Sequence, residues 1–437
     1  MPGLVIERRE CSYLGAAGER WLLLYGRRKT GKTWLLRRCS GWTLYATVAS
    51  DGHCILETRG KGRETLPAPS CVERIATALR RRGVVVVDEF QRLPRSLWDH
   101  VAAASWEAEA GLRLCGSSMR LAAKVFSRNS PLLGLAAPLR VDIAAYSDTL
   151  ASLRRAGLPP RDAALWAVVA RDPWLLRHTA PGRSEPWRVL SAEAPRLLPA
   201  ARGLVGEVFE EEERQLTRLY DAVLRLLAEG YWRAADIAQR LHQAGLAPSP
   251  EAGYATGVLA VLEEIGLVER VPLWRTRRSR RYYRHRSSLL ALLYSVADEV
   301  EELGLTPSPD ALRSRYGVEL GFNIGEMMAE RHGLARGYSI QPGGRDVDAV
   351  LLDRHGSPQW GYEVKAGPMS AGELRGLAEW LRSLGIPRAG AVALGGLPPA
   401  ASRLLDDALD AEGLAELAAR LAEEAAERAR REAASPD

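Results

Sequence analysis

A glycine-rich stretch near the N-terminus carries residue types that bind phosphate. Its residues, Gly26-Arg27-Arg28-Lys29-Thr30-Gly31-Lys32-Thr33, have the spacing GxxxxGK[ST]. The two glycines let the backbone curl until its N–H groups point inward, Lys32 reaches the β- and γ-phosphates, and Thr33 offers a hydroxyl to Mg²⁺. The sequence therefore predicts that residues 26–33 bind a nucleoside triphosphate with Mg²⁺. An ordinary glycine-rich turn is the alternative.

Two acidic residues follow a run of four valines and suggest the second half of such a site. Asp88 and Glu89 come directly after residues 84–87, which read as a strand buried on both faces. Asp88 is expected to hold Mg²⁺ through water, and Glu89 to act as the catalytic residue that polarises the attacking water. A plain strand end with two acids is the alternative.

A third short strand, residues 112–116, ends in Ser117 and Ser118. The tip of a parallel strand beside the other two lies near the γ-phosphate, so Ser117 is predicted to contact the nucleotide. A polar turn between a strand and a helix explains the two serines equally well.

These segments resemble the archaeal ATPase family of P-loop proteins, within the AAA-like and STAND-like NTPases. The similarity rests on residues 6–10 (Ile-Glu-Arg-Arg-Glu), 25–28, 88–91 (Asp-Glu-Phe-Gln) and 116–118. Residues 130–135 are similar to the family's Ser-Pro-Leu-Tyr-Gly-Arg segment, but Leu135 stands where the family has arginine. The resemblance implies ATP as the nucleotide, a parallel sheet with helices on both faces, and slow turnover unless Arg140, Arg128 or a partner replaces the missing arginine.

The elements around these motifs set the expected organisation. A strand at 22–25 runs into the loop, and a helix at 34–39 follows it, so that the helix N-terminus adds partial positive charge. Residues 147–201 read as short helices broken by prolines, in the place of the family's lid. The fold class is α/β, with a P-loop core at 1–145 and a helical lid at 146–215.

Residues 216–305 have the order of a winged helix-turn-helix, with three helices followed by a hairpin. Within residues 271–286 arginines and aromatic residues are interleaved without any acid. Because arginine pairs with phosphate and planar side chains stack on bases, the segment predicts contact with DNA, against the alternative of acidic protein surfaces. The predicted contacts are Arg275, Arg277, Arg278, Arg280, Arg281, Tyr282, Tyr283, Arg284 and Arg286.

Near the C-terminus, two predicted strands carry Asp348 and then Glu363 and Lys365, the spacing D…ExK. Carboxylates on adjacent strands can hold a divalent metal, with Lys365 stabilising charge, which is chemistry suited to phosphodiester hydrolysis. This part resembles the PD-(D/E)xK nuclease superfamily, which implies an α/β domain at 306–437 with Asp348, Glu363 and Lys365 catalytic. Glu326 on the preceding helix would be a third metal ligand, with Glu319 and Glu330 as competitors and Asp346 competing with Asp348.

Composition is that of a globular protein of 437 residues, with net charge +6 and a pI near 9.1. No apolar run is long enough for a membrane span, and no signal peptide is evident, so a cytoplasmic protein without membrane contact is expected. Five scattered cysteines predict neither zinc nor a disulfide scaffold. The function expected is an ATPase that engages DNA with possible metal-dependent cleavage, alone, as a homo-oligomer or with a protein partner. The alternative is a nucleotide-dependent signalling switch or transcription regulator.

Overall fold

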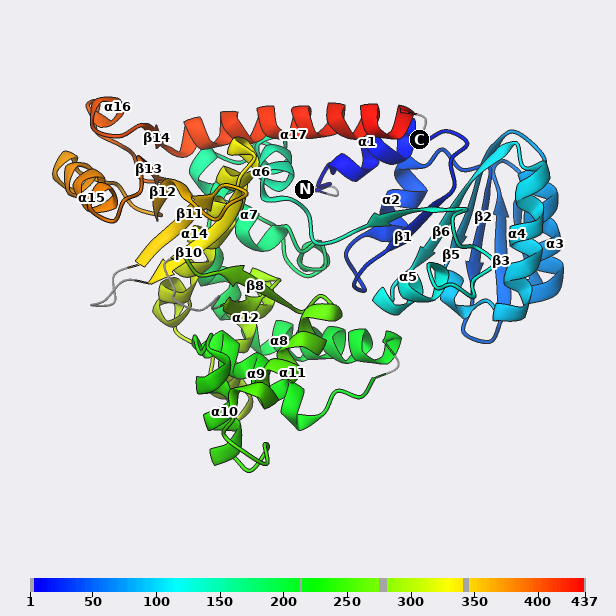
Figure 1. Cartoon of the computed structure of the whole chain (residues 1–437), viewed down its shortest axis with the longest axis horizontal. Coiled ribbons are helices and arrows are strands. Elements are labelled where there is room, and N and C mark those ends of the chain that lie inside the picture. The colour runs from blue at the N-terminus through cyan, green and yellow to red at the C-terminus, as the bar shows by residue number, and fades with distance from the viewer. Residues whose placement is uncertain (1–3, 213, 275–280, 341–345, 436–437) are drawn as a thin grey trace. The chain divides into compact units, whose positions relative to one another are not determined.

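The computed structural model describes residues 4–212, 214–274, 281–340 and 346–435, and these form two compact units (Figure 1). The N-terminal unit comprises Arg8–Ile143, Gly206–Gln215 and Glu423–Asp437. The C-terminal unit comprises Met1–Glu7, Ala144–Val205 and Leu216–Ala422. As domains, the four predicted segments 1–145, 146–215, 216–305 and 306–437 stay a prediction.

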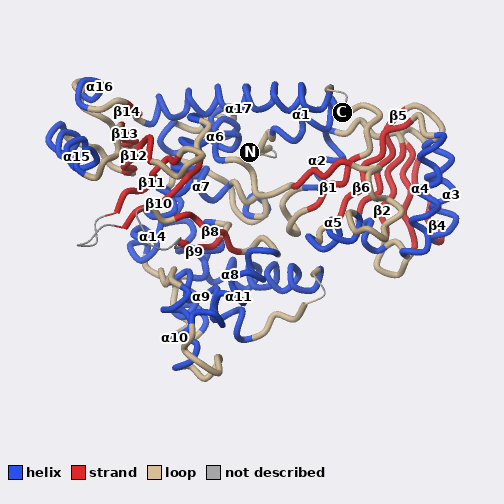
Figure 2. Tube along the Cα trace, in the orientation of Figure 1, coloured by secondary structure: helices blue, strands red, loops and turns tan. Residues whose placement is uncertain are grey.

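A seven-stranded sheet forms the centre of the N-terminal unit (Figure 2), in the order β4-β3-β2-β5-β6-β1-β7. The strands are β1 (Leu22–Tyr25), β2 (Leu44–Val48), β3 (His53–Thr58), β4 (Gly62–Pro67), β5 (Gly83–Asp88), β6 (Ala110–Gly116) and β7 (Ala137–Arg140). The five strands from β2 to β7 in this order pair in parallel, whereas β3 and β4 add an antiparallel edge. The parallel sheet predicted from the sequence is confirmed, and the antiparallel edge was not foreseen.

Both faces of this sheet are covered, as the continuous apolar runs require. In β1, Leu23 packs into one apolar cluster while Leu22 and Leu24 pack into another; in β5, Val85 and Val87 join the first cluster and Val86 the second. Because successive side chains of a strand point to opposite faces, each cluster lies on one side of the sheet.

Among the described residues, five helices lie entirely within the N-terminal unit: α1 (Arg9–Ala16), α2 (Lys32–Cys39), α3 (Ala68–Leu79), α4 (Trp98–Ala103) and α5 (Met119–Val125). Helices α3, α4 and α5 contribute to the first apolar cluster, and α1 and α2 to the second. Short 3₁₀ turns are η1 (Phe90–Arg92), η2 (Arg95–Leu97) and η3 (Ala104–Glu107).

The expectation that the cysteines form no disulfides is wrong. Cys11 is joined to Cys39 and Cys54 to Cys71, while Cys115 is free and buried. The first pair links α1 to α2 and the second links β3 to α3, with Cα atoms 5.1 and 6.1 Å apart, inside the range that a disulfide spans. Packing of elements distant in sequence brings these cysteines together, which their spacing does not reveal.

The C-terminal unit contains a five-stranded sheet in the order β10-β11-β12-β13-β14. Its strands are β10 (Ala335–Ile340), β11 (Asp346–Leu352), β12 (Pro358–Lys365), β13 (Arg388–Ala393) and β14 (Asp407–Leu409). The pairs β10–β11 and β11–β12 are antiparallel, and the pairs β12–β13 and β13–β14 are parallel. The two strands predicted to carry the D…ExK residues are therefore neighbours.

Most remaining helices belong to the C-terminal unit: α6 (Tyr146–Arg155), α7 (Pro160–Ala170), η4 (Leu175–Arg177), α9 (Arg218–Glu229), α10 (Ala234–Gln243), α11 (Ala252–Glu264), α12 (Ser288–Tyr294), α13 (Ala297–Glu301), α14 (Pro309–His332), α15 (Ala371–Ser383) and α16 (Ala401–Leu404). Two long helices, α8 (Pro186–Glu211) and α17 (Ala411–Ala434), carry the chain from this unit into the other. Helix α8 contains Pro195 and Pro199, so these two prolines do not end a helix as the sequence suggested. No helix in the described part of the chain is both long and apolar enough to cross a membrane.

Helices α9, α10 and α11 are followed by the antiparallel hairpin of β8 (Val268–Pro272) and β9 (Arg281–His285). The hairpin is tied to the five-stranded sheet, because Leu273 bridges Tyr338 of β10 and the Trp274 N–H donates to the Tyr338 carbonyl at 2.9 Å. The predicted order of elements is present, and the hairpin packs against the C-terminal sheet.

Candidate nucleotide site

The loop between β1 and α2 has the backbone that phosphate binding requires. Gly26, Lys29 and Gly31 have φ values of +147°, +62° and +94°. A Cβ atom on Gly26 would lie 2.1 Å from the carbonyl oxygen of Val141, so only glycine fits there. The glycines therefore shape residues 26–31 into a curled loop that leads directly into α2, one of whose first residues is Thr33.

Lys32 lies inside this loop. Its Nζ donates hydrogen bonds to the carbonyl oxygens of Gly26 and Arg27, both at 2.8 Å. Burial lowers the pKa of Lys32, while the nearby Cys115, Glu89 and Asp88 act in the opposite direction. A lysine held across the loop in this way is positioned to exchange carbonyl oxygens for phosphate oxygens.

Two further side chains, those of Thr30 and Arg8, stabilise the loop by hydrogen bonds to its backbone carbonyls. The Thr30 hydroxyl donates to the Arg27 carbonyl at 2.9 Å. Arg8, which is buried, donates to the carbonyls of Thr30 at 2.6 Å and Asp142 at 2.9 Å and pairs with Glu10. Arg8 was quoted in the sequence only as part of a family segment, and its role in fixing the loop appears in the structure.

Thr33, in the first turn of α2, meets Asp88 at the carboxyl end of β5. The Thr33 hydroxyl donates to Asp88 Oδ2 at 2.9 Å, and the Tyr45 hydroxyl donates to the same oxygen at 2.7 Å. Burial, followed by the charge of Asp88, raises the pKa of Tyr45, which therefore stays a donor. A hydroxyl and a carboxylate at the mouth of a phosphate-binding loop are the donors that Mg²⁺ prefers, so the residues present fit this ion.

Glu89 belongs to a small hydrogen-bond network beside the loop, called the relay below, which consists of Glu89, Gln91 and Ser117. It follows Asp88 with φ +58°. The Gln91 amide donates to Glu89 Oε2 at 2.7 Å and to the Ser117 hydroxyl at 3.2 Å, and Ser117 donates to Glu89 Oε2 at 3.4 Å. Glu89 and Ser117 were predicted as site residues, whereas Gln91, which connects them, was quoted only as part of the family segment 88–91.

The predicted arginine substitutes lie on the surface. Leu135 packs against the first apolar cluster, and Arg128 and Arg140 are exposed. Arg92, in contrast, is within 3.5 Å of the Glu89 carboxylate and donates to the Val48 carbonyl at 3.4 Å. Arg28 and Lys29 of the loop pair with Glu207 at 2.8 and 3.1 Å.

Several residues predicted to contact DNA are buried inside the C-terminal unit, which corrects the prediction for them. Arg284 is 3% exposed and pairs with Glu269 and Glu319, while Tyr282 stacks on Trp232. Arg286 pairs with Glu269 at 2.9 Å and Glu326 at 3.3 Å. Arg281 and Tyr283 are half-buried, and Arg275, Arg277, Arg278 and Arg280 lie outside the described residues.

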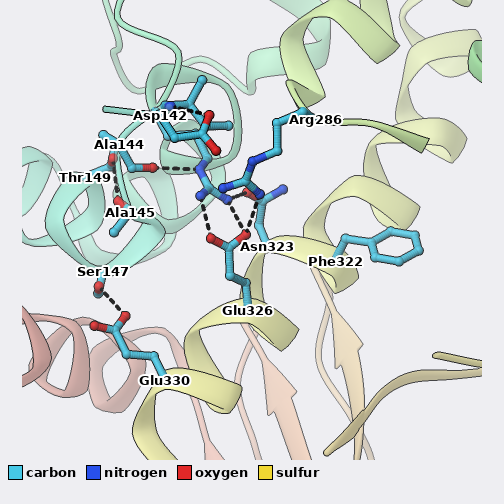
Figure 3. A network of polar contacts seen from close by, with 12 residues as sticks. Asp142, Ala144, Ala145, Ser147, Thr149, Arg286, Phe322, Asn323, Glu326 and Glu330 are labelled. Atoms are coloured by element: carbon cyan, nitrogen blue, oxygen red, sulfur yellow. Dashed lines mark hydrogen bonds and ion pairs between the residues drawn. The ribbon is translucent and has the colours of Figure 1, made fainter. Parts of the chain in front are cut away.

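Glu326 is held by arginines and does not join the other predicted metal ligands, which corrects that prediction. Its carboxylate pairs with Arg171 at 2.8 Å and faces Asn323 and Arg286 (Figure 3). Burial would raise the pKa of Glu326, but Arg171, Arg286 and Arg336 hold it well below its usual range. The competitors are also engaged, because Glu319 pairs with Arg284 and Glu330 accepts from Ser147 at 2.9 Å.

Asp348 and Glu363 do lie on neighbouring strands. Burial, together with the charge of Glu363, raises the pKa of Asp348 well above its usual value, and Asp348 Oδ2 accepts from the Val364 N–H at 2.7 Å. Lys365 pairs with Glu373 at 2.9 Å. Within the described ranges no three His, Cys, Asp or Glu side chains form a group able to hold a metal ion. The structure thus brings two of the predicted carboxylates together without a third.

The strand order, the curled loop and the Thr33–Asp88 contact define the class of the N-terminal unit, which has the P-loop NTPase fold. In the sheet, β6 lies between β1, which leads into the loop, and β5, which bears the acids. This arrangement places four side chains close together at the loop, namely Lys32, Thr33, Asp88 and Glu89.

No protein-family model matches the sequence, and neither does any curated protein. Among solved structures, a Walker-type ATPase of Pyrococcus abyssi is similar, with 19% identity and a TM-score of 0.43 over 66% of this chain and 96% of that one. The ORC2 protein of Aeropyrum pernix in ADPNP–ADP complexes has 15% identity and a TM-score of 0.39, over 73% and 95%. The ORC1 protein of Aeropyrum pernix in complex with DNA has 20% identity and a TM-score of 0.31, over 69% and 96%. At these scores the class rests on the geometry described above.

Proposed function

We propose that the chain binds and hydrolyses ATP with Mg²⁺ and uses this cycle to engage DNA. The observation that carries the ATPase proposal is the assembly of Lys32, the Thr33–Asp88 pair and the Glu89–Gln91–Ser117 relay at one loop. In it, the loop N–H groups and Lys32 would bind the phosphates. Thr33 and Asp88 would hold Mg²⁺, which would supply positive charge to the phosphates, and Glu89 would take the proton from the attacking water.

The direct test is nucleotide binding by Lys32→Ala. The variant loses a charge-assisted contact with phosphate, so its affinity for Mg²⁺-ATP should fall about ten- to a hundredfold. Lys61→Ala is the matched control, because Lys61 is an exposed lysine of the same unit, in the turn between β3 and β4. Undiminished binding by Lys32→Ala in calorimetry would refute the assignment.

The DNA part of the proposal now rests on a smaller set of residues. Helices α9–α11 and the hairpin β8–β9 keep the order of a winged helix-turn-helix, and four arginines, Arg275, Arg277, Arg278 and Arg280, lie in the sequence that joins the two strands. Phosphate contacts need cations that are free to face the duplex, and Arg284 and Arg286 are committed to glutamates. We therefore assign the DNA contact to this connecting segment.

Replacing these four arginines by alanine tests this assignment. If each contacts one phosphate, the variant should bind duplex DNA more weakly, with a salt dependence shallower by about three to four units. Any stimulation of the ATPase by DNA should be lost with the contact. Arg270→Ala is the control, since Arg270 is an exposed arginine of β8 that pairs with Glu263. If the variant with all four substitutions binds DNA with unchanged affinity and unchanged salt dependence, the connecting segment is not the DNA contact.

A second candidate function is a nucleotide-dependent switch or regulator whose C-terminal sheet binds partners and does not cleave. The engagement of Glu326 by Arg171 and of Lys365 by Glu373 favours it over a nuclease. A cleavage assay with Mg²⁺ or Mn²⁺ on linear, branched and single-stranded DNA separates the two. This candidate predicts no cleavage, whereas cleavage abolished by Asp348→Asn and by Glu363→Gln would establish a nuclease site.

A further inference from the structure

The last turn of α8 places two glutamates on the nucleotide site within the N-terminal unit. Glu207 lies 2.8 Å from Arg28 Nε and 3.1 Å from Lys29 Nζ. Glu211 pairs with Arg28 through Nη1, accepts from the Gln91 amide at 3.1 Å and lies 3.8 Å from Arg92. Carboxylates from a distant part of the sequence thus form ion pairs with Arg28 and Lys29 of the loop and lie close to Arg92 beside the relay.

The next residue, Glu212, fixes this turn to the tip of β6. Its side chain is buried and accepts hydrogen bonds from the Ser118 hydroxyl at 3.1 Å, from the Arg120 N–H at 3.2 Å and from the Met119 N–H. The Arg120 guanidinium donates to the Glu212 carbonyl at 2.8 Å. Glu212 therefore holds Glu211 at the edge of the site where Ser117 and Ser118 lie.

The contacts of Gln91 show that Glu211 competes with the relay. A glutamine amide nitrogen has two N–H donors. Three acceptors lie within hydrogen-bond distance of it: Glu89 at 2.7 Å, Glu211 at 3.1 Å and Ser117 at 3.2 Å. Glu211 therefore competes with Ser117 and Glu89 for the two N–H donors of Gln91.

Electrostatic repulsion by a bound nucleotide is the force that can move the Glu211 carboxylate. A triphosphate brings several negative charges to the loop, and like charges repel strongly where the surroundings are partly desolvated. The Glu211 side chain is only 12% exposed. Bound phosphate would therefore take over the cations that Glu207 and Glu211 neutralise and repel the two carboxylates.

We infer that Glu207 and Glu211 form an autoinhibitory acidic latch, which occupies the site before nucleotide binds and is displaced by the nucleotide's phosphates. This inference rests on the proposed ATPase function. The latch belongs to the stretch Gly206–Gln215, directly after the point where α8 leaves the C-terminal unit.

The test compares Glu211→Gln with Glu210→Gln. Glu210 is exposed, lies on the same helical turn and makes the same charge change when replaced. Removing the latch charge should tighten binding of Mg²⁺-ADP and of a non-hydrolysable Mg²⁺-ATP analogue about three- to tenfold, whereas Glu210→Gln should stay near the wild-type value. Equal affinities of the two variants, or weaker binding by Glu211→Gln, would overturn the inference.

Amide hydrogen exchange supplies a second measurement on the unmodified chain. Adding the Mg²⁺-ATP analogue should speed the exchange of amides in residues 207–212, because the latch leaves the site. Unchanged or slower exchange there would contradict the latch. If the wild type binds no nucleotide at all, the proposed function itself fails; if the wild type and Glu210→Gln bind well and Glu211→Gln matches them, only the latch fails.

Discussion

At the residue scale, Gln91 connects two residues of the nucleotide site that the sequence predicted. Glu89 was predicted from its place after Asp88, and Ser117 from its place at a strand tip. The structure shows Gln91 between them, in contact with both. We infer that it is a positioning residue, which orients the Glu89 carboxylate toward the attacking water.

Gln91→Ala tests this role. Without the amide, Glu89 loses its fixed orientation, so ATP turnover should fall about tenfold or more while nucleotide affinity changes by less than about twofold. Gln215→Ala serves as the control, because Gln215 is exposed in the same unit. A variant that weakened binding and turnover equally would show that Gln91 acts in binding and not in orienting the base.

There is a physical reason why some of these site residues could be predicted from the sequence and others could not. Residues 26–33 and Asp88 act through backbone curl, charge and position at a strand end, all of which are local and visible in the sequence. Gln91, Arg92 and Glu211 reach the site through side-chain rotamers and through the packing of α8, which depend on the whole fold.

At the element scale, the hairpin β8–β9 shows how a basic sequence can become a structural core. Residues 271–286 contain no acid, but Glu269 comes from the start of β8, and Glu319 and Glu326 come from α14. Three arginines hold the pKa of Glu269 at about 2, against the effect of its burial. Partners so far apart in sequence could not be assigned to one another without the fold.

Arg284→Ala should strongly destabilise the C-terminal unit. It would leave Glu319, whose side chain is 0% exposed, without its main counter-charge, at a cost of about 3–5 kcal/mol in the free energy of unfolding. Arg281→Ala, in the same strand and half-buried, should change that free energy by less than about 1 kcal/mol. Denaturant unfolding of both variants measures the difference, and equal stabilities would contradict the buried network.

His285, also in β9, makes the stability of the C-terminal unit depend on pH. Burial lowers its pKa from 6.5 to about 4, with Arg315 and Arg284 lowering it further and Glu319 opposing them, while Nε2 lies 2.8 Å from the Leu224 carbonyl. The unfolded chain therefore takes up a proton that the folded chain excludes. The stabilisation is complete above pH 6.5 and is lost as the pH falls toward 4, by roughly 3 kcal/mol.

Unfolding free energies at pH 7 and pH 5 measure the part of this loss that falls between these pH values, roughly 2 kcal/mol. In His285→Gln, which keeps a donor for the Leu224 carbonyl and does not titrate, the pH dependence should be clearly smaller. The same pH dependence in the variant and the wild type would show that another group is responsible.

At the scale of the whole molecule, the alternation of strands and helices predicted the parallel sheet, because buried runs such as residues 84–87 constrain the chain strongly. The division of the chain into two units could not be predicted from the sequence. It depends on α8 and α17, each of which begins in one unit and ends in the other. The prolines in α8 concealed this continuity, since Pro195 and Pro199 read as helix ends and are in fact accommodated within the helix.

The central claim is that the loop at Gly26–Thr33 and the acids at Asp88 and Glu89 form a working ATPase site. Phosphate release from Mg²⁺-ATP by the wild type and by Glu89→Gln tests it most directly, with nucleotide binding measured in parallel. The account predicts that Glu89→Gln binds ATP as the wild type does and turns it over about a hundredfold or more slowly. Equal turnover by the two proteins would contradict it.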